Sequence, residues 1–312
     1  MSTASRVRGW LIWALGSSFC LMGQIAQFEV KEDKILIRMS SGETREAPAA
    51  GVDRKFIRVS PDRTKLVYHP VFAGYPPNTD LRVRVWSSAR PEKVEEFRVP
   101  TLSRHIDSVE WIDNRLVLFA GDGYGVMVDS DNGALVNRFF GTDFAVSPDR
   151  KRILYWLNLG RSVPDFVSDR AMLAVLGAQP RPSREVEEIK PGVYRLYPSE
   201  EEIDRCVSLQ WSADRPECRH RALTPFAWFS DSRRAVFLEW HEGTVWMAML
   251  VLEINDSSIS VRQERFALPL TEEKQLKQLS WLKQDEEVQF EMGDKHVIVN
   301  PLSRTVRWDV PR

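Results

Sequence analysis

Cysteine is scarce in this sequence of 312 residues, which has only Cys20, Cys206 and Cys218. So few cysteines cannot form the dense disulfide framework of a small secreted domain. The spacing of Cys206 and Cys218 fits neither a CxxC redox motif nor a four-ligand zinc site. Because these two residues flank a predicted turn at nearly equal distances, we predict one structural disulfide between them. Two free thiols are the alternative.

An excess of charge of either sign is also missing. The chain has 43 Lys and Arg against 44 Asp and Glu, and its formal net charge is −1. The charges are interspersed, whereas a protein that follows a phosphate backbone needs a clustered basic surface. We therefore predict no nucleic-acid partner.

Signatures of catalysis are absent as well. The sequence contains neither a GxSxG nucleophile elbow nor an HExxH metal motif. Its five histidines show no paired ligand spacing, so tertiary folding alone would have to assemble a zinc site. The sequence predicts no cofactor and no metal ion.

The N-terminal segment has no acidic residue, two arginines and the apolar stretch WLIWALGSSFCLMG. This pattern is typical of a signal peptide and is short for a membrane span, which needs about 20 residues. We predict that residues 1–26 are a signal peptide or N-terminal anchor and that 27–312 form a single domain, periplasmic or secreted. The alternative is a membrane tether through 10–26, because a cut after Ala26 would place Gln24 where a small residue is preferred.

One sequence pattern recurs along the chain: an alternating apolar strand, a polar turn with Asp, and a second alternating strand. Pro61 and Pro148 pre-set the backbone for the first central position of their turns. The clearest copies are FIRVSPDRTKLVYH (56–69), FAVSPDRKRILYW (144–156) and FAWFSDSRRAVFLEW (226–240); VEWIDNRLVLFA (109–120) and LSWLKQDEEVQFEM (279–292) are looser. In three copies Trp111, Trp228 and Trp281 share one position, and we expect them to pack between neighbouring sheets.

A second kind of hairpin follows each of these copies. VWSSARPEKVEEFRVP (85–100) and QWSADRPECRHRALTP (210–225) resemble each other, and 126–140, 248–266 and 296–310 have the same form. The two hairpins together make a four-stranded unit, which can be written five times, over 56–100, 108–141, 143–224, 226–268 and 278–311. Residues 28–48 supply strands of a further unit or close the ring. The pattern predicts an all-β β-propeller of five or six four-stranded antiparallel blades.

The VSPDRTKLVYH and VSPDRKRILYW segments resemble the repeats of the TolB-like, WD40-like propeller group. Repeats of that group typically read Ser-Pro-Asp-Gly-Lys before an apolar strand, and here Arg63 and Arg150 stand in place of the Gly. The resemblance covers most of the chain after about residue 50 and implies a propeller fold. It implies no single activity, because the group includes periplasmic interaction proteins, peptidase-associated domains and hydrolases.

Strand reversal decides which connections share a face of such a fold. The turns inside the hairpins emerge on one face, while the links between hairpins and between blades emerge on the other. The two longest excursions, 69–80 and about 157–205, belong to the second face. Within the latter we predict a short helix over SDRAMLAVLG (168–177), with Ser168 as its N-cap, and SEEE (199–202) resembles a capping box.

Aromatic and ionisable residues gather at the predicted strand ends of this second face. We predict a binding surface there, although aromatic residues at strand ends also serve packing. Its candidate residues are His69, Tyr75, Tyr124, Trp156, Trp240, His241 and Glu242.

The sequence thus favours an exported, non-catalytic propeller. It would bind a protein or peptide partner, in the cell envelope or outside the cell, through the face bearing loops 69–80 and 157–205. One alternative is a propeller hydrolase or lyase that uses His69, His241 and Glu242. Another is a structural subunit of an envelope complex.

Overall fold

The computed structural model describes thirteen stretches of the chain, which divide into two compact units, Met1–Phe139 and Phe140–Arg312. Strands dominate both units, and the described part of the chain contains only one helical turn, η1 (Arg54–Phe56). Each unit is described by itself. The described residues are 23–49, 52–69, 80–100, 106–121, 123–157, 169–177, 179–184, 186–197, 221–241, 244–255, 257–270, 276–293 and 295–309.

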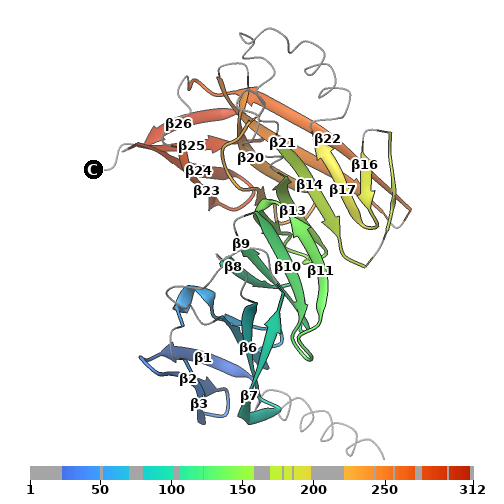
Figure 1. Cartoon of the computed structure of the whole chain (residues 1–312). Coiled ribbons are helices and arrows are strands. Elements are labelled where there is room, and N and C mark those ends of the chain that lie inside the picture. The colour runs from blue at the N-terminus through green and yellow to red at the C-terminus, as the bar shows by residue number, and fades with distance from the viewer. Residues whose placement is uncertain are drawn as a thin grey trace, which may run out of the picture. The chain divides into compact units, whose positions relative to one another are not determined.

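The first unit consists of three antiparallel meanders, drawn in blue to green in Figure 1. The first sheet has three strands, β1 (Ile25–Val30), β2 (Lys34–Met39) and β3 (Thr44–Pro48). The second has β4 (Arg58–Val59), β5 (Lys65–Tyr68), β6 (Leu81–Ser87) and β7 (Arg90–Val99). The third has β8 (Ile106–Trp111), β9 (Leu116–Gly121), β10 (Tyr124–Asp129) and β11 (Leu135–Phe140).

The second unit also contains three sheets, drawn in green to red in Figure 1. The first has β12 (Thr142–Val146), β13 (Arg152–Leu157), β14 (Arg170–Val175), β17 (Val193–Tyr197) and β16 (Glu187–Lys190). The second has β18 (Arg221–Ala222), β19 (Ala227–Trp228), β20 (Arg234–His241), β21 (Thr244–Ile254) and β22 (Ser258–Ala267), with β15 (Arg181–Pro182) parallel to β22. The third has β23 (Leu276–Lys283), β24 (Glu287–Met292), β25 (Lys295–Asn300) and β26 (Thr305–Asp309).

Alternation along the strands explains how these sheets pack. In β6, for example, Leu81, Val83 and Val85 are buried while the residues between them are partly exposed. Each unit therefore has two hydrophobic cores, one between each pair of successive sheets. Six sheets in chain order, antiparallel except for the β15–β22 pair and packed face to face within each unit, are the blades of a β-propeller. The predicted all-β propeller is confirmed, and its described blades number six.

The predicted helix over 168–177 is wrong. Residues Arg170–Val175 form β14, which lies between β13 and β17 in the middle of its sheet. A strand that is covered on both faces has an unbroken apolar run rather than an alternating one, and AMLAVL has that pattern. Its four central residues are buried, so the run is equally compatible with a buried strand.

The fourth blade also differs from its predicted composition. Its third and fourth strands are β14 and β17, which pair antiparallel with Leu173 opposite Tyr194, rather than the segments on either side of the SADRPE phrase. Of those segments the structure describes only the end, where β18 pairs with β20 of the next blade. The predicted excursion of 157–205 therefore contains three strands of this blade, β14, β16 and β17, and also β15, which pairs with β22 of the next blade. SEEE (199–202) lies outside the described residues.

The N-terminal boundary of the first blade lies before residue 27. β1 begins at Ile25, whose side chain is fully buried, and Gln24 Nε2 donates to Asp62 O at 3.2 Å. Residues 1–22 lie outside the described part of the chain. No helix within the described part is long and apolar enough to cross a membrane.

Candidate functional site

The Ser-Pro-Asp segments form matching turns in the two units. Ser60 Oγ donates to Asp62 Oδ1 at 2.6 Å, and Thr64 N donates to the same oxygen at 3.0 Å. Ser147 Oγ likewise donates to Asp149 Oδ1 at 2.6 Å. Partial burial opposes the charged form of each aspartate, but these hydrogen bonds outweigh burial and lower the pKa of both carboxyls. The repeated aspartates therefore close turns, as the repeat pattern predicts.

Arg63 and Arg150 occupy the left-handed positions of these turns. Their φ angles are 61° and 59°, in the region where Gly is least strained. The Arg63 side chain compensates, since its Nε donates to Ile25 O and its Nη2 to Ala26 O, both at 2.5 Å. This arginine thus connects the second blade to the first strand of the first blade.

Other hydrogen bonds connect the turns of successive blades. In the first unit Asp62 N donates to Asn114 Oδ1 at 2.9 Å. In the second unit Asp149 N donates to Ser232 Oγ at 2.9 Å. We call the ends of the blades that carry these turns the turn face of each unit, and the opposite ends the loop face.

The repeated tryptophans connect the same blades at a deeper level. The indole Nε1 of Trp111 donates to Arg58 O at 3.0 Å, and that of Trp228 donates to Ala145 O at 2.9 Å. Trp281 Nε1 donates to Trp228 O at 2.7 Å. Each indole therefore reaches the carbonyl at the corresponding position of the preceding blade. This confirms the prediction that these tryptophans pack between blades.

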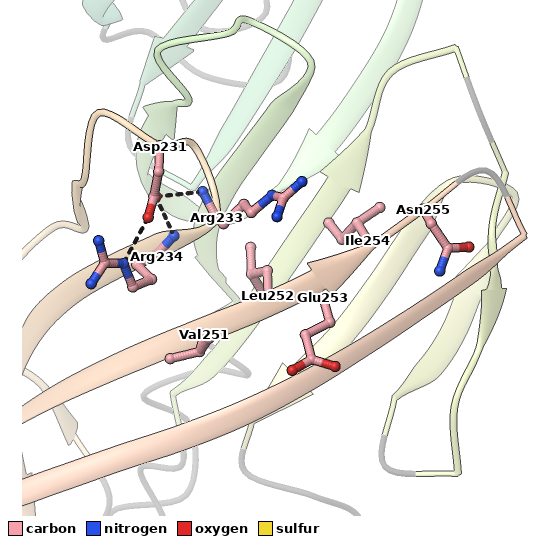
Figure 2. A pocket seen from close by; sticks show the side chains of 8 residues that line it. All are labelled: Asp231, Arg233, Arg234, Val251, Leu252, Glu253, Ile254 and Asn255. Carbon is pink, nitrogen blue, oxygen red and sulfur yellow. Dashed lines mark hydrogen bonds and ion pairs between the residues drawn. The ribbon is translucent and has the colours of Figure 1, made fainter.

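A groove of about 440 Å³ lies on the turn face of the second unit. It forms where the β19–β20 turn meets the end of β21, and Leu252 N donates to Arg233 O at 2.7 Å across this junction. Its lining residues are Asp231, Arg233, Arg234, Val251, Leu252, Glu253, Ile254 and Asn255 (Figure 2).

The charges of the groove are only partly paired. Arg234 Nε donates to Asp231 Oδ2 at 2.7 Å, and its guanidinium lies 4.4 Å from the centre of the Phe229 ring. The exposed side chains of Arg233 and Glu253 have no hydrogen-bonded partner among the described residues, and Figure 2 shows them pointing to opposite sides of β21. A free guanidinium can bind a carboxylate or phosphate oxygen. Sequence reasoning missed this groove, because it depends on the contact between the turn and β21.

On the loop face of the first unit, the structure buries two of the predicted site residues. His69 is 6% exposed, its Nδ1 lies 3.0 Å from Arg82 O, and its ring meets Phe56 edge to face. Burial lowers the pKa of His69 and so favours the neutral imidazole. Tyr124 is 3% exposed and belongs to the core between the second and third sheets.

On the loop face of the second unit, Trp156 is also a core residue. It is 1% exposed, its Nε1 donates to Thr224 O at 3.1 Å, and its ring stacks on Phe226. Trp240 is half-buried near the end of β20. His241 is the last residue of β20, and its backbone pairs with Thr244 of β21. Burial therefore makes His69, Tyr124 and Trp156 part of the scaffold rather than residues that a partner could touch.

Four further predicted residues lie outside the described part of the chain: Tyr75, Glu242, Cys206 and Cys218. Their roles stay predictions. Among the residues that the structure describes, no three His, Cys, Asp or Glu side chains converge as metal ligands would.

No protein-family model and no curated protein matches this sequence. Among solved structures, hydrazine synthase from Kuenenia stuttgartiensis is 10% identical with a TM-score of 0.46, over 88% of this chain and 72% of that one. The Swd1 β-propeller domain of Myceliophteria thermophila is 10% identical with a TM-score of 0.44, over 93% and 88%. The β-propeller domain of the trilobed protease from Pyrococcus furiosus is 11% identical with a TM-score of 0.40, over 90% and 88%. Similarities this low carry no argument about function, so the blades described above are the basis of the fold assignment.

Proposed function

We propose that this chain is an exported, non-catalytic β-propeller that binds a protein or peptide partner in the cell envelope or outside the cell. The observation that supports this function is the distribution of its longest connections. Residues 69–80 join β5 to β6, 158–169 join β13 to β14, and 198–220 join β17 to β18. All three leave the loop face of their own unit, whereas the other long connection, 176–192 between β14 and β17, leaves the turn face and contains β15 and β16.

The turn face differs from the loop face in the length of its connections. Most of its connections are short, and hydrogen bonds tie them to the neighbouring blades, as in the pairs Asp62–Asn114 and Asp149–Ser232. Long connections held by a rigid scaffold are the usual location of binding residues. The loop face therefore carries three of the four longest connections on a fixed frame, which is an arrangement that suits partner recognition.

Residues of the loop-face connections would make the contacts. We assign this role to Tyr75, Trp240, His241 and Glu242, because an aromatic ring beside ionisable groups supplies both apolar area and directional hydrogen bonds. The buried residues His69, Tyr124 and Trp156 would support the strand ends from which these connections leave.

Export rests on the N-terminal sequence alone. Residues 1–22 contain the apolar, acid-free segment and lie outside the described part of the chain. The partner would then be an envelope or extracellular protein.

Capture of partners from a native envelope extract tests the proposal. The chain with Tyr75→Ala and Glu242→Ala should lose the captured protein, because both changes remove loop-face side chains. The matched control carries Lys151→Ala and Arg233→Ala, two exposed residues of the turn face, and should capture as well as the unaltered chain. Equal capture by both variants would place the binding surface elsewhere.

A further inference from the structure

One asparagine of the chain stands in the acceptor sequence for N-linked glycosylation, Asn-x-Ser/Thr with x other than Pro. The sequence has seven asparagines, and only the one in Asn255-Asp256-Ser257 meets this pattern. An acceptor asparagine must lie at the surface of an exported chain, because the attached sugars are bulky and hydrophilic. The place of Asn255 in the fold therefore decides whether the motif can be used.

Asn255 lies in the turn between β21 and β22, on the turn face of the second unit. The strand pairing ends with Ile254 opposite Ile259, and Asn255 N then donates to Ser258 O at 3.0 Å. Asn255 and Ser257 are exposed, whereas Ile259 is fully buried. The hairpin is thus closed by its own backbone, and both motif side chains are accessible.

The side chain of Asn255 is bound through its oxygen. Oδ1 accepts from Ser257 N at 2.9 Å, from Ser257 Oγ at 2.8 Å and from Ser258 N at 2.8 Å. Because two of these donors are backbone N–H groups, they determine which atom of the carboxamide is the oxygen. Nδ2 has no hydrogen bond within the described part of the chain, and it is the atom that would carry the sugar. Attachment there breaks none of the three bonds to Oδ1.

The Ser257 hydroxyl has a chemical role in such a transfer. By donating to Oδ1 it draws charge toward the carbonyl oxygen, which eases the loss of a proton from Nδ2. Nδ2 would attack C1 of a sugar that is attached to a lipid diphosphate. A C–N bond forms, the bond between C1 and the phosphate oxygen breaks, the lipid diphosphate leaves with the electron pair, and Nδ2 gives up one proton. The chain supplies the acceptor, and a glycosyltransferase of the cell supplies the catalyst.

Space for the first sugars lies directly beside the turn. Asn255 lines the groove of about 440 Å³, together with Arg233, Glu253 and Ile254 (Figure 2). Arg233 can donate hydrogen bonds to sugar hydroxyls and Glu253 can accept them, while Ile254 offers apolar surface to the face of a sugar ring. A glycan on Nδ2 would begin at the edge of this groove and would displace no strand.

We propose that Asn255 is the attachment site of an N-linked glycan, transferred from a sugar donor that is linked to a lipid diphosphate. This inference rests on the proposed export of the chain, because Asn-x-Ser/Thr is an acceptor sequence of exported proteins. The glycan would keep the turn face of the second unit hydrated. It would leave the loop face of the same unit open for the partner.

Mass spectrometry of the full chain, purified from the cells that make it, tests the proposal. The tryptic peptide 235–262 contains Asn255 and should carry the added mass of a chain of sugar residues, which fragmentation should assign to Asn255. Ser257→Ala should lose this mass, since it removes the hydroxyl and keeps the backbone donor, and Ser257→Thr should retain it. The matched control is Ser258→Ala, which changes a neighbouring serine outside the motif and should retain the glycan.

Fractionation of the same cells reports export separately from glycosylation. An exported chain without sugar on Asn255 would overturn the inference and leave export standing. A chain found in the cytosol with unmodified Asn255 would overturn both. Sugar that persists on Asn255 in the Ser257→Ala variant would also count against the inference, because the acceptor sequence would then not direct the attachment.

Discussion

Replacement of Trp111 by Phe should lower the free energy of unfolding of the first unit by about 2–3 kcal/mol. The indole is 4% exposed and its Nε1 donates to Arg58 O at 3.0 Å. Phe cannot donate this bond, and a carbonyl left without its donor costs about 1–2 kcal/mol when it is partly buried. The smaller ring also buries less apolar area and leaves a gap, which adds about 1 kcal/mol.

Urea denaturation followed by far-UV circular dichroism measures the change. Hydrogen exchange of the β8 and β9 amides should be measured as well, because the two units need not unfold together and these amides report on the first unit alone. The matched control is Trp308→Phe on β26, since Trp308 is 44% exposed and its indole has no hydrogen bond among the described residues. That change should cost less than about 0.5 kcal/mol. Equal losses from the two substitutions would refute the assigned role of the indole hydrogen bond.

Three further predictions concern the turns, the cysteines and the N-terminus. The pKa of Asp149 is lowered in the folded chain, so its carboxylate stabilises the fold above its unfolded pKa of about 3.9, and this contribution is lost as pH falls through the folded value. The melting temperature of the Asp149→Asn variant should therefore fall less steeply below about pH 4 than that of the unaltered chain. Parallel plots of melting temperature against pH for the two chains would contradict this. Cys206 and Cys218 should resist alkylation until a reductant is added, and two labels without reductant would exclude the disulfide. The mature chain should retain Gln24, because this residue and Ile25 belong to the first blade; a mass spectrum showing a mature chain that begins at residue 27 would contradict the structure.

Local chemistry made the repeating part of the fold predictable. The Ser-Pro-Asp turns need a serine, a proline and an aspartate at fixed offsets, so their recurrence located the hairpins directly. Trp111, Trp228 and Trp281 recur because each donates to the preceding blade. A residue that performs one structural task in every blade is visible as a repeat in a single sequence.

Other features depend on tertiary contacts that the sequence pattern does not encode. The apolar run in 170–175 fits a buried helix and a central strand equally well, and only its pairing with β13 and β17 decides between them. Trp156 stands at a strand end, where either recognition or packing is possible, and its stacking on Phe226 shows packing. The groove beside Arg233 forms only because the β19–β20 turn contacts the end of β21, and the sequence pattern does not show this contact.

Photo-crosslinking in the cells that make this protein tests the central claim most directly. A photoreactive amino acid in place of Tyr75, on the loop-face connection 69–80, should give a discrete adduct with an envelope or extracellular protein. The same amino acid in place of Arg233, exposed on the turn face, is the matched control and should give none. An adduct at position 233 without one at 75 would contradict loop-face recognition.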